Sequence, residues 1–152
     1  MASPSNPESI RIGLFSNSPD RAADFSRMFQ PSIVDGTFDL HLITGGMDQI
    51  PRSLPLQCLM IDLEGFPDAL DLIRQIRLSR PSLVLLIIDS NCNGEHVVNA
   101  VLAGVRGCID PNCDSVTARQ AVKDVLDGLF WLPPQVMSMV IDRLLEIRRS
   151  QG

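Results

Sequence analysis

Short continuous apolar runs alternate along this chain with stripes of apolar residues at helical spacing. The continuous runs end abruptly in polar or turn-forming residues, a pattern typical of buried strands in a parallel sheet. A fifth segment, residues 38–43, alternates apolar and polar residues and is expected nearer an edge of the sheet. The continuous runs predict strands over residues 10–15, 58–63, 83–88 and 107–110.

Most of the predicted strands are followed by a segment whose apolar residues recur at helical spacing. Ser18 and Asp68 are suitable N-caps, and the spacing predicts helices over residues 95–103 and 115–127, among others. Residues 44–55 contain two glycines and two prolines and permit at most a short helix. A last helix begins after Trp131, with the apolar stripe Met137, Val140, Ile141, Leu144 and Leu145.

This order of elements predicts a doubly wound α/β fold. Strand–helix units joined by right-handed crossovers give a five-stranded parallel sheet with helices on both faces, here followed by an extra C-terminal helix. The length of 152 residues fits one domain. We expect a loose N-terminal tail over residues 1–9, the domain over residues 10–130, and a helix or connector over residues 131–152.

Charge and hydropathy exclude several classes of function. The formal net charge of −5 argues against a nucleic-acid-binding surface, which needs clustered Lys and Arg. No apolar run approaches the ~18 residues that span a bilayer, and the polar start is unlike a signal peptide. A cytoplasmic location follows as an expectation, and reduced thiols are then expected at Cys58, Cys92, Cys108 and Cys113.

Asp62 is the first candidate for a functional side chain. It ends a buried strand, and in open α/β sheets the chemistry collects just beyond the carboxyl ends of the strands. Asp89 and Asp110 follow the next two strands, so the three carboxylates could converge and bind a hard cation such as Mg²⁺ or Ca²⁺. The alternative is that Asp89 and Asp110 cap the following helices or face water.

The cysteines offer a second candidate site. Cys92 and Cys113 are expected in adjacent loops at the same edge, with Cys108 close by, where a thiol pair could sense oxidation or hold zinc. There is no Cys-x-x-Cys motif, and His41 and His96 lie elsewhere, which favours cysteines that act as small hydrophobic residues. No phosphate-binding loop, catalytic triad or glycosidase-type carboxylate pair is present, so the sequence does not favour an enzyme.

Several motifs resemble the receiver domain of NarL/LuxR-type two-component response regulators. The resemblance covers residues 10–145 and implies the flavodoxin/CheY-like strand order 2-1-3-4-5. The motifs that carry it are Ile10-Arg11-Ile12 leading to Ser18-Pro19, Met60-Ile61-Asp62-Leu63, Ala103-Gly104-Val105-Arg106-Gly107-Cys108-Ile109 and Gly128-Leu129-Phe130-Trp131-Leu132-Pro133.

The resemblance also assigns roles, and most of the assigned positions hold the wrong residue type. In that family an aspartate after the third strand accepts a phosphoryl group, an acidic pair binds Mg²⁺, a Thr or Ser ends the fourth strand and a Lys ends the fifth. Asp62 matches the acceptor. The degenerate positions are Ser16 and Asn17 for the acidic pair, Asp89 with Ser90 beside it for the hydroxyl, and Pro111 for the lysine.

These replacements remove most of what phosphoryl transfer needs. Cations must neutralise the charge that spreads over the phosphoryl oxygens, and Mg²⁺ prefers carboxylates to the neutral oxygens of Ser16 and Asn17. Pro111 has no donor to offer. Asp89 would add a like charge beside Asp62, which opposes the addition of a further anion.

Three hypotheses follow. The first is a degenerate receiver, or pseudo-receiver: a cofactor-free signalling module that acts through protein contacts as a homodimer, with a histidine kinase or another signalling protein as partner and DNA contact only through an output domain beyond Gly152. The second is a working phospho-acceptor at Asp62 with an unusual Mg²⁺ site. The third is a metal or thiol-redox sensor.

Overall fold

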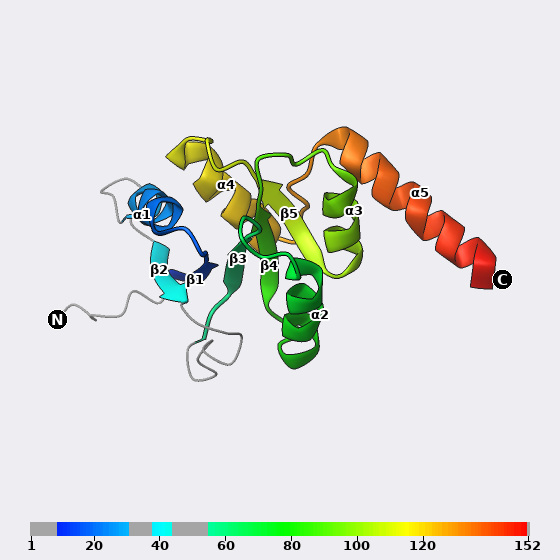
Figure 1. Cartoon of the computed structure of the whole chain (residues 1–152), viewed down its shortest axis with the longest axis horizontal. Coiled ribbons are helices and arrows are strands. Elements are labelled where there is room, and N and C mark those ends of the chain that lie inside the picture. The colour runs from blue at the N-terminus through cyan, green and yellow to red at the C-terminus, as the bar shows by residue number, and fades with distance from the viewer. Residues whose placement is uncertain (1–8, 31–37, 44–54, 152) are drawn as a thin grey trace.

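The computed structural model describes residues 9–30, 38–43 and 55–151, and this part of the chain forms a single α/β unit (Figure 1). The strands are β1 (Ile10–Phe15), β2 (Phe38–Ile43), β3 (Cys58–Asp62), β4 (Val84–Ile88) and β5 (Val105–Ile109). The helices are α1 (Pro19–Met28), α2 (Ala69–Ser79), α3 (Glu95–Leu102), α4 (Ser115–Leu126) and α5 (Pro134–Gln151).

The five described strands form one parallel sheet in the order β2-β1-β3-β4-β5, as predicted. β2 lies at an edge, in keeping with its alternating pattern, whereas β3 lies in the centre with every residue buried. Asp62 is paired with Ile88 in the sheet, so the carboxyl ends of β3 and β4 coincide. The end of β3 therefore lies at the middle of the sheet's carboxyl edge.

Helices cover both faces of the sheet, and the alternation of side chains along each strand gives two cores. One core joins β4 side chains such as Leu85 and Ile87 to α2, α3 and the start of α5. The other joins Leu86 and Ile88 to α1 and α4. A continuous apolar strand such as β4 is explained by this arrangement, because both of its faces are buried.

Two element boundaries differ from the predicted ones by more than one residue. β5 begins at Val105, two residues earlier than expected, because Gly104 ends the α3 turn with a positive φ of 119° and lets the chain enter the sheet at once. α5 begins at Pro134, because Trp131 forms a parallel bridge with Gly107 beside β5. The predicted tail residues 1–8 and most of the ambiguous segment 44–55 lie outside the described residues.

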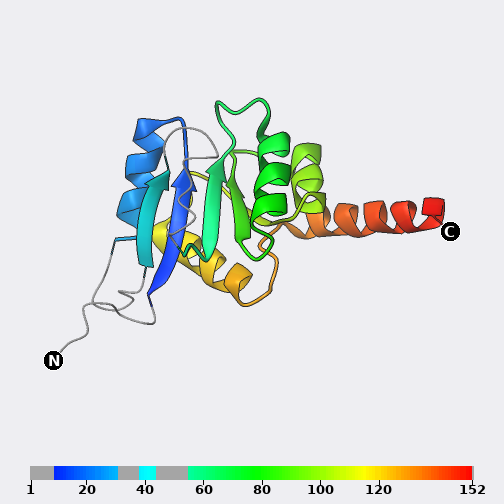
Figure 2. The same cartoon turned by 90° about the horizontal axis from the view of Figure 1, so that it is seen from below.

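α5 packs against α3 only along its first turns and then extends away from the rest of the fold (Figures 1 and 2). Val136 and Val140 are buried in the first of the two cores. Farther along, large apolar side chains are exposed: Ile141, Leu144, Leu145 and Ile147. None of the described helices is both long and apolar enough to cross a bilayer.

Candidate functional site at the end of strand β3

The carboxylate of Asp62 is fully buried. Its relative exposure is 0%, and it is the one charged side chain of the described chain in the buried class. An isolated ionised carboxylate in such a place costs several kcal/mol or more, so partners must compensate it. The arrangement of those partners determines what Asp62 can do.

Three donors hold Asp62. The guanidinium of Arg21 donates from Nη1 to Oδ1 at 2.7 Å, and the backbone N–H of Glu64 donates to the same oxygen at 3.1 Å. The hydroxyl of Ser16 donates to Oδ2 at 2.9 Å. Both oxygens are therefore occupied, one of them by a charge-assisted bond of the stronger kind.

Arg21 is shared between two carboxylates. Its Nη2 lies 2.7 Å from Oε2 of Glu64, while its Nη1 binds Asp62. The Arg21 side chain is 23% exposed and that of Asp62 1%, whereas Glu64 is largely in solvent. The Arg21 guanidinium thus neutralises the buried carboxylate of Asp62 and also forms an ion pair with the exposed carboxylate of Glu64.

The start of α1 places Arg21 over the sheet edge. Ser18 caps the helix by accepting the backbone N–H of Arg21 at 3.3 Å, and Pro19 suits the first turn. Arg21 lies one turn before the buried Phe25, so it belongs to the side of α1 that faces the sheet. Its long side chain reaches the end of β3 from there.

The loop after β1 also closes on the loop after β3. Asn17 donates from Nδ2 to the backbone oxygen of Gly65 at 3.0 Å. Gly65 has a φ of +82°, a conformation that glycine adopts without strain, and this lets the chain turn under Asn17. Ser16 and Asn17, the two positions assigned to a magnesium-binding acidic pair, thus bind Asp62 and its loop directly.

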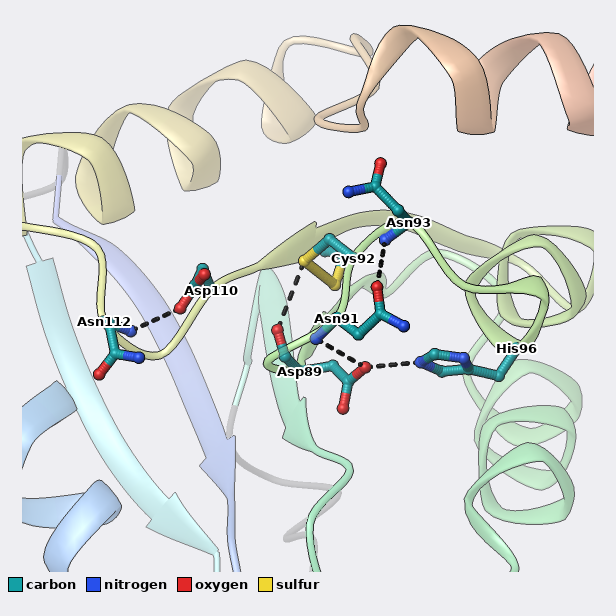
Figure 3. The surroundings of a disulfide bond; sticks show 8 residues. Asp89, Asn91, Cys92, Asn93, His96, Asp110 and Asn112 are labelled. Atoms are coloured by element: carbon teal, nitrogen blue, oxygen red, sulfur yellow. Dashed lines mark hydrogen bonds and ion pairs between the residues drawn. A yellow bond between two sulfur atoms is a disulfide. The ribbon is translucent and has the colours of Figure 1, made fainter.

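Asp89 and Asp110 stabilise their own loops. The Asp89 carboxylate accepts the N–H of Asn91 at 3.3 Å and contacts Nε2 of His96, as Figure 3 shows. Asp110 accepts the N–H of Asn112 at 2.8 Å. Neither caps a helix, since both form Asx turns, which aspartate favours in loops; of the two, Asp110 is exposed to water. The two carboxylates have different partners: Asp62 binds Ser16, Arg21 and the Glu64 amide, whereas Asp89 binds Asn91 and His96.

The residues around Asp62 do not fit a magnesium ion. Mg²⁺ requires oxygen ligands in near-octahedral geometry, and here the buried carboxylate is already bound by a cationic guanidinium. Among the described residues no three histidine, cysteine, aspartate or glutamate side chains gather closely enough to hold a metal. The proposed set Asp62, Asp89 and Asp110 is therefore not assembled.

The expectation of four reduced cysteines is wrong for two of them. Cys92 and Cys108 form a disulfide with a Cα–Cα distance of 5.7 Å, and Cys58 and Cys113 are free. The faces of the sheet explain the pairing. Cys108 points to the face covered by α3, and Cys92 lies in the loop that leads into α3. Cys113, the other candidate partner, packs against the opposite core.

Comparison with solved structures finds several proteins with a similar fold. A LuxR-family two-component response regulator from an Aurantimonas species matches with a TM-score of 0.72 and 17% identity, over 90% of this chain and 99% of that chain. The isolated REC domain of RcsB from Salmonella enterica serovar Typhimurium matches with a TM-score of 0.69 and 18% identity, over 91% and 99%. The chain has a receiver-like fold.

A longer protein extends the comparison. The response regulator ChrA of a heme-sensing two-component system matches with a TM-score of 0.65 and 21% identity, over 90% of this chain and 66% of that one. No protein-family profile matches the sequence, and no curated protein is significantly similar to it. At such identities the likeness shows the fold alone.

Arg21 is the site residue that the sequence reading missed. The predicted site residues follow the ends of strands, whereas Arg21 lies in the first turn of helix α1. A signal was present, because Arg21 shares the inner side of α1 with Phe25. A charged residue at such a position near a strand's carboxyl end needs a buried partner of opposite charge, and Asp62 is that partner.

Proposed function

We propose that this chain is a non-enzymatic signal-transduction module, a receiver-like domain of a response regulator that acts through protein contacts in the cytoplasm. In this proposal Asp62 is a fixed structural charge rather than a phosphoryl acceptor. The observation that carries it is the buried ion pair between Asp62 and Arg21.

The electrostatics of the pair oppose phosphorylation. Transfer of a phosphoryl group to a carboxylate needs cations in excess of the existing negative charge. Both oxygens of Asp62 are engaged, and the Arg21 guanidinium is already shared with Glu64. Adding a phosphoryl group would place more negative charge beside two carboxylates that share one arginine. The position of the lysine is filled by Pro111, which has no donor.

The proposed output is self-association through α5. Beyond its contact with α3, this helix exposes Ile141, Leu144, Leu145 and Ile147, and contiguous apolar surface of this kind favours association. The acidic Asp142 and Glu146 precede the basic pair at 148–149 along the helix. An antiparallel pair of α5 helices would set these opposite charges side by side, so a second copy of the chain is the partner that fits.

Other partners belong to the same proposal. A histidine kinase or another signalling protein would contact the domain, and DNA contact would belong to an output domain outside these residues. The net charge of −5 is consistent with this division, because phosphate-rich nucleic acid would be repelled.

Sedimentation velocity on the full chain tests the proposal. With Mg²⁺ present, the ratio of dimer to monomer should be the same with and without a small phosphoryl donor. A shift towards dimer that appears with the donor and disappears in Asp62→Asn would overturn it. That result would support the second candidate, a working phospho-acceptor, which is favoured by the place of Asp62 at the end of β3.

A further inference from the structure

The disulfide between Cys92 and Cys108 joins two segments that also hold α5. Cys92 lies in the loop between β4 and α3, and Cys108 lies on β5 at the open edge of the sheet. Figure 3 shows Cys92 above the Asp89 turn, with His96 of α3 closing the other side of that turn. The bond therefore fastens the entry of α3 to the edge strand.

Two further contacts run from this loop to α5. Gln135, in the first turn of α5, donates to Oδ1 of Asn93 at 3.5 Å, and Arg143 forms an ion pair with Glu95. Asn93 follows Cys92 directly in the sequence, and Glu95 comes two residues after Asn93. The two residues that bind α5 therefore lie close to Cys92, one in the loop and the other at the start of α3.

Cys108 is connected to the segment before α5 by backbone hydrogen bonds along β5. Its backbone N–H donates to the oxygen of Trp131 at 3.0 Å, and the N–H of Trp131 donates to Arg106 at 3.1 Å. Trp131 stands just before α5. Both ends of the disulfide therefore lie one short segment away from the helix that we propose as the association surface.

The disulfide is open to a reagent in solution. Both of its cysteines line a groove of about 510 Å³ that also includes Cys113, Trp131 and Leu132. Cys92 is half-buried, whereas Cys108 is buried, so Cys92 is the more exposed residue of the pair.

The surroundings also accommodate the reduced pair. The sulfur of Cys92 lies 3.5 Å from the backbone oxygen of Asp89, which would accept a hydrogen bond from the thiol once it carries a proton. Cys108 lies in an apolar core, a place that suits a protonated thiol. Disulfides in a reducing cytosol are mostly transient and redox-sensing, and the proposed location therefore calls for a bond that opens and closes.

We propose that Cys92 and Cys108 form a reversible redox site, opened by a dithiol reductant, whose state sets how firmly α5 is held against the domain. The dithiol's thiolate attacks the sulfur of Cys92, the bond to Cys108 breaks, and the Cys108 thiolate takes up a proton. The second thiol of the reductant then displaces Cys92 from the mixed disulfide. Two electrons and two protons pass to the pair, and the dithiol becomes a disulfide.

Cys113 is not required for this exchange. Burial raises the pKa of its thiol, with the nearby Asp110 and Asp114 adding to the effect, so little thiolate is available to attack the bond. It therefore supplies a matched control in the same groove. The inference does not depend on whether Asp62 is phosphorylated.

Redox titration of the folded full chain with dithiothreitol and its oxidised form tests the proposal. Alkylation after unfolding should count two free thiols in the oxidised protein, Cys58 and Cys113, and four in the reduced one. Amides of residues 91–95 and the first turns of α5 should exchange with solvent about tenfold faster after reduction, which corresponds to a loss of about 1.4 kcal/mol in local stability. Amides of β1 and β3 should be unchanged.

Variants complete the test. Cys92→Ser should exchange like the reduced protein in either buffer, and Cys113→Ser should behave like the wild type. If Cys92→Ser fails to fold, the reduced wild type supplies the comparison. The proposal is overturned if the oxidised protein contains four thiols, if the bond opens only when the whole domain unfolds, or if reduction leaves the exchange of α5 unchanged.

Discussion

Replacing Arg21 with alanine should destabilise the domain far more than replacing an arginine on the surface. The Arg21 guanidinium binds a carboxylate whose side chain is 1% exposed. Removing one partner of a buried pair typically costs about 3–5 kcal/mol, because the other charge stays buried without compensation. Arg21 is itself 23% exposed, so water can enter the vacated space and reduce the loss to about 2–3 kcal/mol.

The free energy of unfolding is measured by urea denaturation, monitored by circular dichroism, beside a matched control variant. Arg27→Ala removes another α1 arginine, whose ion pair with Asp24 lies in solvent, and should change stability by less than about 0.5 kcal/mol. For a chain of this length, the loss expected for Arg21→Ala corresponds to a melting temperature lower by about 5–10 °C.

A second variant separates the buried charge from the lost contacts. Asp62→Asn removes the charge and keeps the shape, so Arg21→Ala should cost much less in that background than in the wild type. Equal costs of Arg21→Ala and Arg27→Ala in the wild type would show that the Arg21–Asp62 pair does not stabilise the domain. So would strict additivity of the Arg21 and Asp62 substitutions.

Three other predictions concern the rest of the domain. Hydrogen bonds from Thr117 in the first turn of α4 lower the pKa of Asp114. The contribution of Asp114 to stability is therefore complete above the ordinary aspartate pKa and disappears as pH falls through the lowered pKa. Acid-unfolding curves should lose this component in Asp114→Ala, whereas Asp114→Asn should keep the helix cap. Burial raises the pKa of the Cys58 thiol to about 12, so iodoacetamide should label Cys113 well before Cys58 in the folded protein, and comparable labelling rates would contradict this. Ile141→Lys should weaken self-association by about tenfold or more in sedimentation equilibrium, since it places a charge in the proposed interface. Ser150→Lys, on the opposite side of α5 from Ile141, should have little effect.

The alternation of apolar runs and stripes was enough to predict the fold class and the place of most strands. Strands such as residues 10–15 and 38–43 were located to the residue, and the place of Asp62 at the end of β3 followed from the abrupt end of its apolar run. Buried parallel strands carry this signal strongly, because both faces are covered and each position is apolar. The order of the strands came from the resemblance to receiver domains.

The contacts of the site were harder to predict, because they join residues far apart in the chain. Arg21 and Asp62 are 41 residues apart, and their contact depends on how α1 lies over the sheet. The disulfide depends on which face Cys108 takes in β5, and the predicted start of that strand was two residues late. The contact of Asp89 with His96, seven residues later, is another that the sequence did not indicate.

The state of Asp62 decides the central claim, and mass spectrometry measures it directly. The full chain would be incubated with a small phosphoryl donor and Mg²⁺ and weighed intact, beside Asp62→Asn treated in the same way. We expect that neither protein gains a phosphoryl group, because the cation that binds Asp62, Arg21, is already shared with Glu64 and leaves no excess positive charge for the phosphoryl oxygens. A gain of one phosphoryl group in the wild type that is missing from Asp62→Asn would contradict it.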